Sequence, residues 1–580
     1  MLSVAEYRRT LLCHTLVPSG PIPTAQDPDG VYPYESFCET SRRPAARELN
    51  FIRLENDRVA VEICPDLGGK VFSMRHKGSG REVLYAPEIV RAVRILPRGF
   101  YIPGGIEVSF PISHSPVQAV PVLFRTARQG GRVYAWCGER ELRFGMHWTV
   151  EYSLGKDDAF LTQRTVFFNG TSTAWPWMSW SNACLYADPD ARIQFPNGPV
   201  LYHGGEMKTI DWAAEGPRTQ ADIDRMAGYF WREPDCCAFG VFNPSRGTGL
   251  YHVADPKLTP GIKFWTYGVG RHEAWSRASS PGGEQYLEIQ GGPLVDQSIK
   301  DHLQPGQVRW HQEFWVPTDE ALDIHALAVP SVKLVKLDAV PRFEWARREE
   351  TTIWQEVARA YAKKSDELLP EAPGIDDNRW APSGMEELEA ALQWAVDATD
   401  YEQGGRWLMQ LGAWLAGRDR VDEAIAALIR SSDDRARALA GRLYRRNKGD
   451  CKAAAEAFRA IREPAVALHP QVMVERDLAL AGLGDETLAE REEWLMKVDA
   501  LEDEWLRERL AALRIDQGRW PEAREILCTA PFQLVHQRYA RTKMWRRIEK
   551  ELGEKPMKDI AFLGEDDLAE FGAYREYLED

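Results

Sequence analysis

Short alternations of apolar and polar residues run along the chain from about residue 50 to about residue 317. The clearest are Val59-Ala-Val-Glu-Ile-Cys64, His147-Trp-Thr-Val-Glu-Tyr-Ser-Leu154 and Phe160-Leu-Thr-Gln-Arg-Thr-Val-Phe-Phe168. A period of two, interrupted by Gly, Pro and Asp, predicts strands joined by turns. Because few helical stretches separate these strands, the pattern indicates a large antiparallel β-sandwich rather than β-α-β units.

The pattern changes near residue 345, where Ala, Leu, Glu and Arg recur with a spacing near 3.6. Two similar segments end at Ala454 and Ala523, 69 positions apart, which is close to two periods of the roughly 34-residue tetratricopeptide repeat. The pattern therefore predicts TPR-like α-helical hairpins, with an irregular helical bundle as the alternative. We expect an N-terminal arm (1–45), a catalytic β-domain (46–320), a linker (321–344) and a helical domain (345–580).

Composition narrows the classes of partner. A net charge of −15 argues against a broad surface for nucleic acid or an anionic membrane, because phosphate binding requires clustered Lys and Arg. The start of the chain lacks the pattern of a signal peptide, and no run of 18 apolar residues occurs, so we expect a cytoplasmic protein. The nine cysteines are scattered, which predicts neither a disulfide framework nor a zinc site.

Two glutamates in strand-like surroundings are the candidate catalytic residues. Glu107 follows Gly104-Gly105, in a segment whose prolines exclude a helix, and Glu288 precedes Gly291-Gly292. Each lies between apolar neighbours, where partial desolvation favours acid–base chemistry. Glycoside cleavage commonly needs two such acids facing one cleft. The alternative is that either is a structural carboxylate paired with Arg. The next candidate acids are Asp255, Glu273, Asp296 and Glu313.

Aromatic residues and histidines suggest how a sugar is held. No Trp precedes residue 136, and eleven of the 21 lie between residues 136 and 315. A flat indole suits the apolar face of a pyranose, although a place in the core is the alternative for each. The candidate substrate-binding residues are His114, Trp180, Asn182, His203, His252, Trp265 and Gln290. No metal-ligand spacing, nucleophile elbow, dinucleotide fingerprint or P-loop occurs, so we expect no metal and no cofactor.

Four motifs, in this order, resemble those of an uncharacterised bacterial family in which a galactose mutarotase-like β-supersandwich precedes tetratricopeptide repeats. They are Pro65-Asp-Leu-Gly-Gly69, Gly104-Gly-Ile-Glu-Val-Ser-Phe-Pro-Ile-Ser-His114, Trp180-Ser-Asn-Ala183 and Tyr286-Leu-Glu-Ile-Gln-Gly-Gly-Pro293. The resemblance covers residues 45–320, and the helical tail near Phe532 also fits it. In mutarotases the base is a glutamate in a Glu-x-Gln setting, which Glu288-Ile-Gln290 resembles. Their acid is a histidine after Thr-Asn, and that histidine is missing after Asn182.

The missing histidine argues against simple anomer interconversion, because ring opening needs a proton donor opposite the base. The leading prediction is therefore a glycoside hydrolase that cleaves short oligosaccharides with Glu107 as acid and Glu288 as base or nucleophile. An epimerase or mutarotase acting on a free monosaccharide, with Glu288 as base and a histidine as acid, is the second hypothesis. The third is a noncatalytic carbohydrate-binding scaffold whose repeats bind a protein. The repeats could equally cover the sandwich or build a homodimer.

Overall fold

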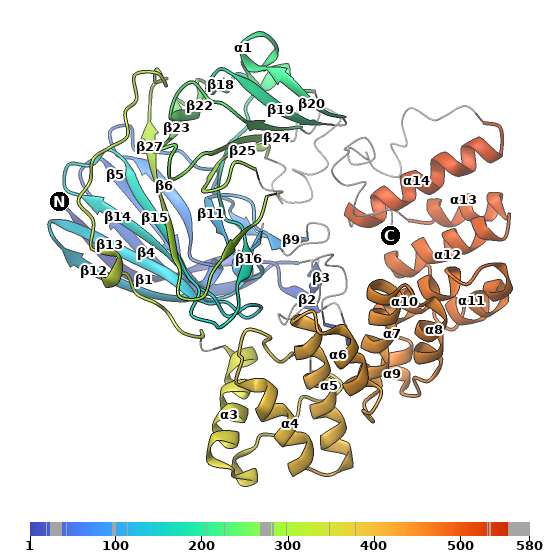
Figure 1. Cartoon of the computed structure of the whole chain (residues 1–580). Coiled ribbons are helices and arrows are strands. Elements are labelled where there is room, and N and C mark those ends of the chain that lie inside the picture. The colour runs from blue at the N-terminus through green and yellow to red at the C-terminus, as the bar shows by residue number, and fades with distance from the viewer. Residues whose placement is uncertain are drawn as a thin grey trace.

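The structure of the protein is a computed structural model that describes most of the chain. The described residues are 1–18, 20–23, 37–41, 43–94, 100–112, 114–204, 206–224, 227–266, 280, 284–296, 299–346, 348–377, 379–530, 532 and 535–554. Strands fill the first half of the chain and helices the second (Figure 1). The predicted fold class, an antiparallel β-supersandwich followed by helical hairpins, is confirmed.

The larger of the two main sheets carries the candidate glutamates. In spatial order its strands are β20 (Glu206–Asp211), β19 (Pro199–Gly204), β21 (Ala227–Trp231), β24 (Gly261–Thr266), β25 (Tyr286–Gly292), β17 (Trp180–Tyr186), β11 (Ile106–Ser109), β6 (Lys70–His76), β5 (Val59–Cys64), β4 (Ala45–Glu55), β1 (Ser3–Cys13) and β8 (Ile89–Val90), with β7 (Arg81–Glu82) beside β6. The pairs are antiparallel except β1 with β8.

The smaller main sheet packs against the larger one. Its order is β12 (Leu123–Gln129), β13 (Arg132–Arg140), β14 (His147–Gly155), β15 (Leu161–Phe168), β27 (Val308–Thr318), β23 (Thr248–Ala254), β22 (Ala238–Asn243) and β18 (Arg192–Gln194). Apolar side chains of both sheets form one continuous core, which includes Val61, Ile106 and Val150. Strand alternation explains this, because every second residue faces the partner sheet.

Short elements connect the main strands. Two-stranded ladders join β2 (Leu16–Pro18) with β3 (Phe37–Thr40), β9 (Val93–Arg94) with β10 (Phe100–Tyr101), and β16 (Trp175–Trp177) with β26 (Asp301–Leu303). The short helices between strands are α1 (Trp212–Glu215), η1 (Pro65–Leu67), η2 (Pro116–Ala119) and η3 (Gln220–Asp222). Three more follow the last strand: η5 (Leu337–Ala339) before α3, η6 (Asp366–Leu368) after α3, and η7 (Asp485–Thr487) before α11.

The N-terminal residues differ from the expected arm. Residues 3–13 form β1, which pairs along its whole length with β4 and so belongs to the larger sheet. Most side chains of β1 are exposed or half-buried, and only Leu11 and Cys13 are buried. The strand therefore lacks the apolar alternation by which the other strands are recognised, which is why the sequence pattern did not reveal it.

Residues 319–346, which include the expected linker, cross the outer face of the smaller sheet, and we call them the strap. The Leu322 N–H donates to the Tyr251 hydroxyl at 3.0 Å, and the Val335 and Pro341 carbonyls accept from Arg164 and Thr149 at 3.0 and 2.7 Å. The strap also buries small apolar clusters against this face. It therefore covers the sheet rather than hanging free between the domains.

The helical part follows the strap and curves past the sandwich (Figure 1). Its helices are α3 (Glu349–Lys363), α4 (Leu388–Ala398), α5 (Tyr401–Gly417), α6 (Val421–Leu428), α7 (Asp434–Lys448), α8 (Cys451–Arg459), α9 (Pro464–Ala467), α10 (Pro470–Ala481), α11 (Leu488–Leu495), α12 (Glu504–Asp516), α13 (Trp520–Cys528) and α14 (Val535–Glu551). Side-chain contacts recur between residues about one repeat apart, such as Arg442 with Glu475, 33 positions on. Such nearest-neighbour contacts are typical of stacked helical hairpins.

The two parts of the chain are joined by polar contacts as well as by the strap. Arg348, before α3, binds Glu139 of β13 at 2.6 Å, and the Ser383 hydroxyl donates to the Arg143 carbonyl at 2.6 Å.

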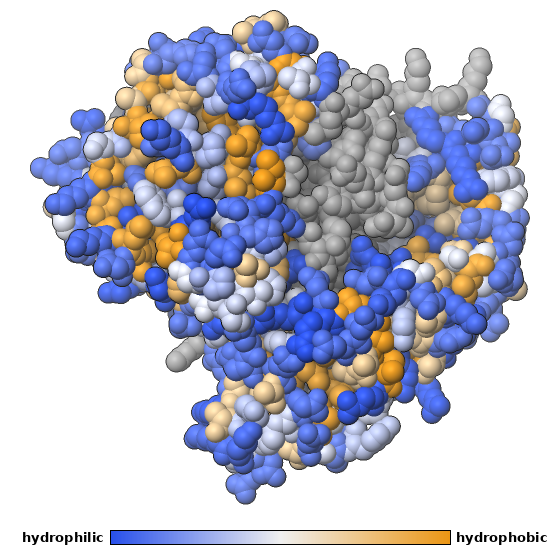
Figure 2. All heavy atoms as spheres, viewed as in Figure 1, coloured by the Kyte–Doolittle hydropathy of each residue, from blue (hydrophilic) through white to orange (hydrophobic). Residues whose placement is uncertain are grey.

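Hydrophilic side chains prevail on the face in Figure 2, with scattered hydrophobic clusters on both parts. Among the described residues, none of the helices combines the length and apolarity needed to cross a bilayer.

Candidate functional site

The register of four adjacent strands brings predicted site residues into one row of the larger sheet. Glu107 on β11 lies opposite Asn182 on β17, and Asn182 lies opposite Gln290 on β25. Gln290 in turn lies opposite Lys263 on β24. Residues directly opposite in antiparallel strands project to the same face, so these four side chains share one face of the sheet.

A second row holds the other glutamate. Glu288 lies opposite Cys184 on β17 and Trp265 on β24. These residues are two positions along each strand from the first row, and they therefore project to the same face. Glu107 and Glu288 are two strands apart and offset by two residues, which places their Cα atoms about 12 Å apart for ordinary strand spacing and rise. The prediction that the fold brings the two acids to one face agrees with this register.

The opposite face of the same strands is apolar. Ile106, Ala183, Phe264 and Ile289 belong to the core between the sheets. The polar face is buried too, and Glu107 and Glu288 are only 2% and 3% exposed. We call its residues the polar face: Lys70, Glu107, Asn182, Lys263, Trp265, Glu288 and Gln290.

Glu107 is bound to a histidine from the segment that follows β11. The His114 Nδ1 lies 2.9 Å from Glu107 Oε1, and the Ser109 hydroxyl donates to the same oxygen at 3.3 Å. The Ser109 hydroxyl also accepts the His114 N–H, which holds His114 in a left-handed conformation with φ of 53°. A carboxylate on one ring nitrogen fixes the orientation of an imidazole and leaves the other nitrogen for chemistry.

The paired glycines before Glu107 let β11 approach β6. Gly105 has φ of 71°, and a Cβ there would lie 2.0 Å from the Val71 carbonyl oxygen and 3.2 Å from Lys70 Cε. Only glycine suits both the backbone angle and the space. The motif thus places Lys70 beside Glu107.

Two buried lysines complete the polar face, and neither was among the predicted site residues. Burial lowers the pKa of Lys70, against the opposing charges of Glu107 and Glu288, and its Nζ donates to the Ile102 carbonyl at 2.6 Å. Burial also lowers the pKa of Lys263 to about 8, although the charge of Glu288 opposes the shift. A lone Lys within an apolar strand, as in Ile262-Lys263-Phe264, was the signal that could have found it.

Several polar atoms of this face are buried without a hydrogen bond from the described part of the protein. They are Glu107 Oε2 and both the oxygen and the nitrogen of the Asn182 amide. These two residues face each other across β11 and β17. Unpaired buried polar groups are costly, and a ligand that both donates and accepts would satisfy them. Glu288 differs, because its Oε2 accepts from the Gln290 amide at 2.6 Å.

The two predicted tryptophans join the polar face in different ways. Trp180 is fully buried, and its indole packs so closely on Gly261 and Gly292 that a Cβ at either would lie within 3.0 Å of the ring. Trp265 is 8% exposed, and the Lys263 ammonium lies 4.8 Å from its ring centroid. Trp180 therefore explains why Gly292 is needed.

The predicted histidines His203 and His252 lie in different parts of the sandwich. His203 on β19 reaches the edge of the polar face, where its ring lies 6.1 Å from that of Trp265 and burial lowers its pKa to about 4. His252 on β23 lies between the sheets instead, where its Nε2 is 3.0 Å from Glu313 Oε1. It does not join the polar face.

Of the other candidate acids, Asp296 lies near the polar face, because its charge raises the pKa values of Lys263 and His203. Glu313 is buried between the sheets with His252 and accepts from the Ser181 hydroxyl at 2.6 Å. Asp296 pairs with Arg232 at 2.7 Å, whereas Asp255 accepts the Lys257 N–H in a turn. Glu273 is outside the described residues.

Comparison with known proteins gives two matching family models and solved structures that resemble this chain. A family model described as "Domain of unknown function (DUF5107)" matches residues 26–318, and a model for a C-terminal domain matches residues 354–548. A TPR-domain containing protein from Parabacteroides distasonis, solved by crystallography, is 49% identical, with 98% of each chain covered and a TM-score of 0.93. A galactose mutarotase-like protein from Clostridium acetobutylicum is 13% identical, covering 46% of this chain and 95% of its own, with a TM-score of 0.36.

Proposed function

The chain belongs to the DUF5107 family, and we propose that this member is an epimerase-type enzyme that interconverts the ring forms of a small sugar. Glu288 is the general base, and His114, oriented by Glu107, is the general acid. The observation that carries the proposal is the 2.9 Å contact between Glu107 and His114, on the same buried face as Glu288. It supplies a histidine that the sequence motif after Asn182 lacks.

The chemistry of the polar face suits a neutral, hydroxylated ligand. A sugar hydroxyl both donates and accepts a hydrogen bond, and the Asn182 amide offers an acceptor and a donor side by side. Glu107 Oε2 adds another acceptor next to it. Trp265 supplies an indole at the edge of the same face.

The reaction needs one proton taken and one given. Glu288 removes the proton of the anomeric hydroxyl, the bond between C1 and the ring oxygen breaks, and protonated His114 gives its Nε2 proton to that oxygen. The product is the open aldehyde, with Glu288 protonated and His114 neutral. Rotation about the C1–C2 bond and reversal of both transfers close the ring in the other anomeric form.

The test measures the rate of anomer exchange in a panel of aldoses by NMR saturation transfer, with the full chain as the enzyme. His114→Gln and Glu288→Gln should each lower the exchange rate about 10²–10⁴-fold, the usual contribution of an acid or base. His302→Gln and Glu320→Gln, at exposed positions, are the matched controls and should leave the rate unchanged. Full activity of His114→Gln and Glu288→Gln would overturn the proposal.

Glycoside hydrolysis is the second candidate, favoured by the position of the two glutamates on one face of the sheet. In that case Glu107 acts directly on the substrate, and Glu107→Gln removes activity. In the epimerase, the side-chain carbonyl of the new glutamine in the Glu107→Gln variant still accepts from His114 Nδ1. This variant should therefore keep part of its anomer-exchange rate. Release of new reducing ends from oligosaccharides, without anomer exchange, would establish hydrolysis in its place.

A further inference from the structure

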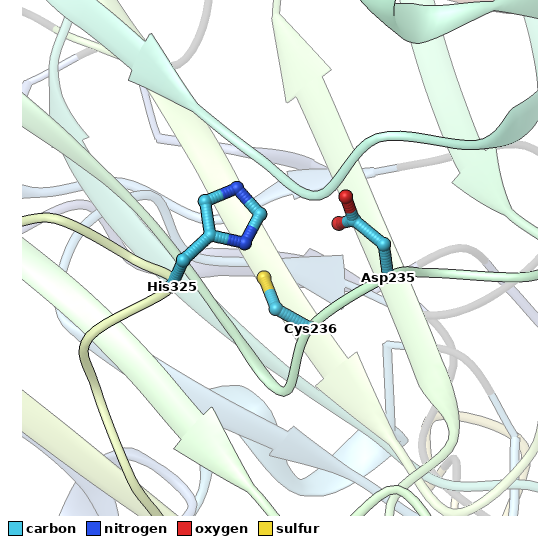
Figure 3. A group of neighbouring side chains, drawn as sticks. All are labelled: Asp235, Cys236 and His325. Atoms are coloured by element: carbon cyan, nitrogen blue, oxygen red, sulfur yellow. The ribbon is translucent and has the colours of Figure 1, made fainter.

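Three potential metal ligands converge where the turn before β22 meets the strap (Figure 3). Asp235 and Cys236 lie in the turn between β21 and β22, and His325 lies in the strap. One ligand atom from each side chain lies within 4.8 Å of the other two. Figure 3 shows the thiol, the imidazole and the carboxylate around a common space.

The surroundings of this cluster are negatively charged. Asp323, two residues before His325, adds a second carboxylate near Cys236. Within the described part of the chain, neither Asp235 nor Asp323 forms an ion pair with Lys or Arg. A cation in the cluster would offset the charges of these two carboxylates.

Asp235 is already held in place. Its two carboxylate oxygens accept from the Asn197 N–H at 2.9 Å and from the Asn197 side-chain amide at 3.0 Å. Outer hydrogen bonds of this kind orient ligating carboxylates in metal sites. Asp235 and His325 are exposed at the surface, so a cation and its water have access to the cluster.

We propose that Asp235, Cys236 and His325 bind a zinc-class divalent cation, with water as the fourth ligand. Thiolate, imidazole and carboxylate are the ligands that Zn²⁺ prefers. Metal–ligand bonds of about 2.0–2.3 Å place ligand atoms about 3.3–3.8 Å apart in a tetrahedron, so the side chains need to approach by about 1 Å. Side-chain rotation of the exposed His325 provides this movement.

The cation would fasten the beginning of the strap to the β21–β22 turn. Nearby, the Cys237 thiol contacts the Leu327 carbonyl at 3.7 Å, and the Gln194 amide donates to the Leu322 carbonyl at 2.7 Å. These neutral contacts already join the strap to the sheet, and three metal bonds would tighten that junction. Zinc binding would therefore slow opening of residues 319–330.

The test is a calorimetric titration of zinc into the full chain, after a chelator has removed any bound metal. Wild type should bind one Zn²⁺ per chain, and Cys236→Ser and His325→Gln should each weaken binding at least tenfold, since each removes one of three ligands. Cys237→Ser is the matched control, because the neighbouring thiol faces a carbonyl of the strap, and it should bind like wild type.

Two further readouts separate this site from unspecific binding. Co²⁺ should give a thiolate charge-transfer band in wild type and Cys237→Ser but not in Cys236→Ser. Zn²⁺ should slow hydrogen exchange in residues 319–330 of wild type only when Cys236 is intact. No zinc binding by wild type, or equal binding by Cys236→Ser, would overturn the proposal.

Discussion

Replacing Gly105 by alanine tests the close approach of β11 to β6 on which the polar face depends. The new Cβ would lie 2.0 Å from the Val71 carbonyl oxygen, at a residue with φ of 71°. The left-handed backbone angle costs alanine about 1 kcal/mol, and the overlap with backbone about 1–3 kcal/mol more. We therefore expect Gly105→Ala to lower the free energy of unfolding by about 2–4 kcal/mol.

Gly130 provides a matched control, because it has φ of 59° and nothing lies within 4 Å of the position that a Cβ would take there. Gly130→Ala should therefore cost only the backbone term of about 1 kcal/mol. For a sandwich of about 300 residues, an unfolding entropy of about 2.1 cal/mol/K per residue converts 1 kcal/mol into about 1.6 °C. Scanning calorimetry of the full chain should show Tm falling by about 3–6 °C in Gly105→Ala and about 1.6 °C in Gly130→Ala.

The same variant carries a functional readout. Pushing β11 from β6 moves Glu107 and Lys70 apart, so anomer exchange should fall in Gly105→Ala and stay unchanged in Gly130→Ala. Equal losses of Tm in the two variants would refute the reasoning, because the contact with Val71 would then add nothing to the cost of the backbone angle.

Three other predictions concern single polar side chains: Arg348, Glu141 and Gln471. Arg348→Met removes the buried ion pair between Arg348 and Glu139 and should lower the unfolding free energy by about 3–5 kcal/mol in calorimetry, and adding Glu139→Gln should restore part of it. Burial raises the pKa of Glu141 to about 7 from 4.5. The contribution of Glu141 to stability is therefore complete below pH 4.5 and is lost as the pH rises through 7. Glu141→Gln should flatten the fall of Tm across that window, and an unchanged slope would contradict this. Gln471→Ala removes both hydrogen bonds that tie Ile22 to α10, at 2.9 and 3.1 Å, and should speed proteolysis near residue 22 without lowering Tm by more than about 3 °C.

Local pattern was sufficient for much of the fold. The alternation in Ile106-Glu-Val-Ser109 and Tyr286-Leu-Glu-Ile-Gln290 marks strands with one apolar face, and it correctly predicts a β-supersandwich followed by helical repeats. The family resemblance drawn from the glycine and glutamate motifs is also confirmed. By contrast, β1 was hidden because its side chains are mostly exposed, so that its pairing with β4 leaves little trace in hydrophobicity.

The site was only partly predictable, because it depends on pairing between distant strands. Glu107 and Glu288 could be chosen from their apolar neighbours, yet their common face follows from a register through β17 that no local pattern reveals. The contact of Glu107 with His114 depends on the left-handed turn at His114. His252 has a similar local setting to His203, but its strand belongs to the other sheet and its ring is enclosed between the two.

The polar face cannot be explained by stability. Lys70, Glu107, Lys263 and Glu288 are each at most 5% exposed. Burying a carboxylate or an ammonium costs several kcal/mol even after relaxation, and apolar side chains of similar size are often equally or more stabilising than a buried ion pair. The alternate positions of the same strands are apolar, so the fold could be built without these charges. Groups of this kind concentrate where chemistry is done. The two lysines balance the two glutamates, and Arg232 balances Asp296. The proton that His114 gives to the sugar returns when the ring closes, so a neutral sugar adds no charge to this buried face, whereas a phosphorylated or acidic sugar would add one. We therefore expect neutral sugars to be the substrates.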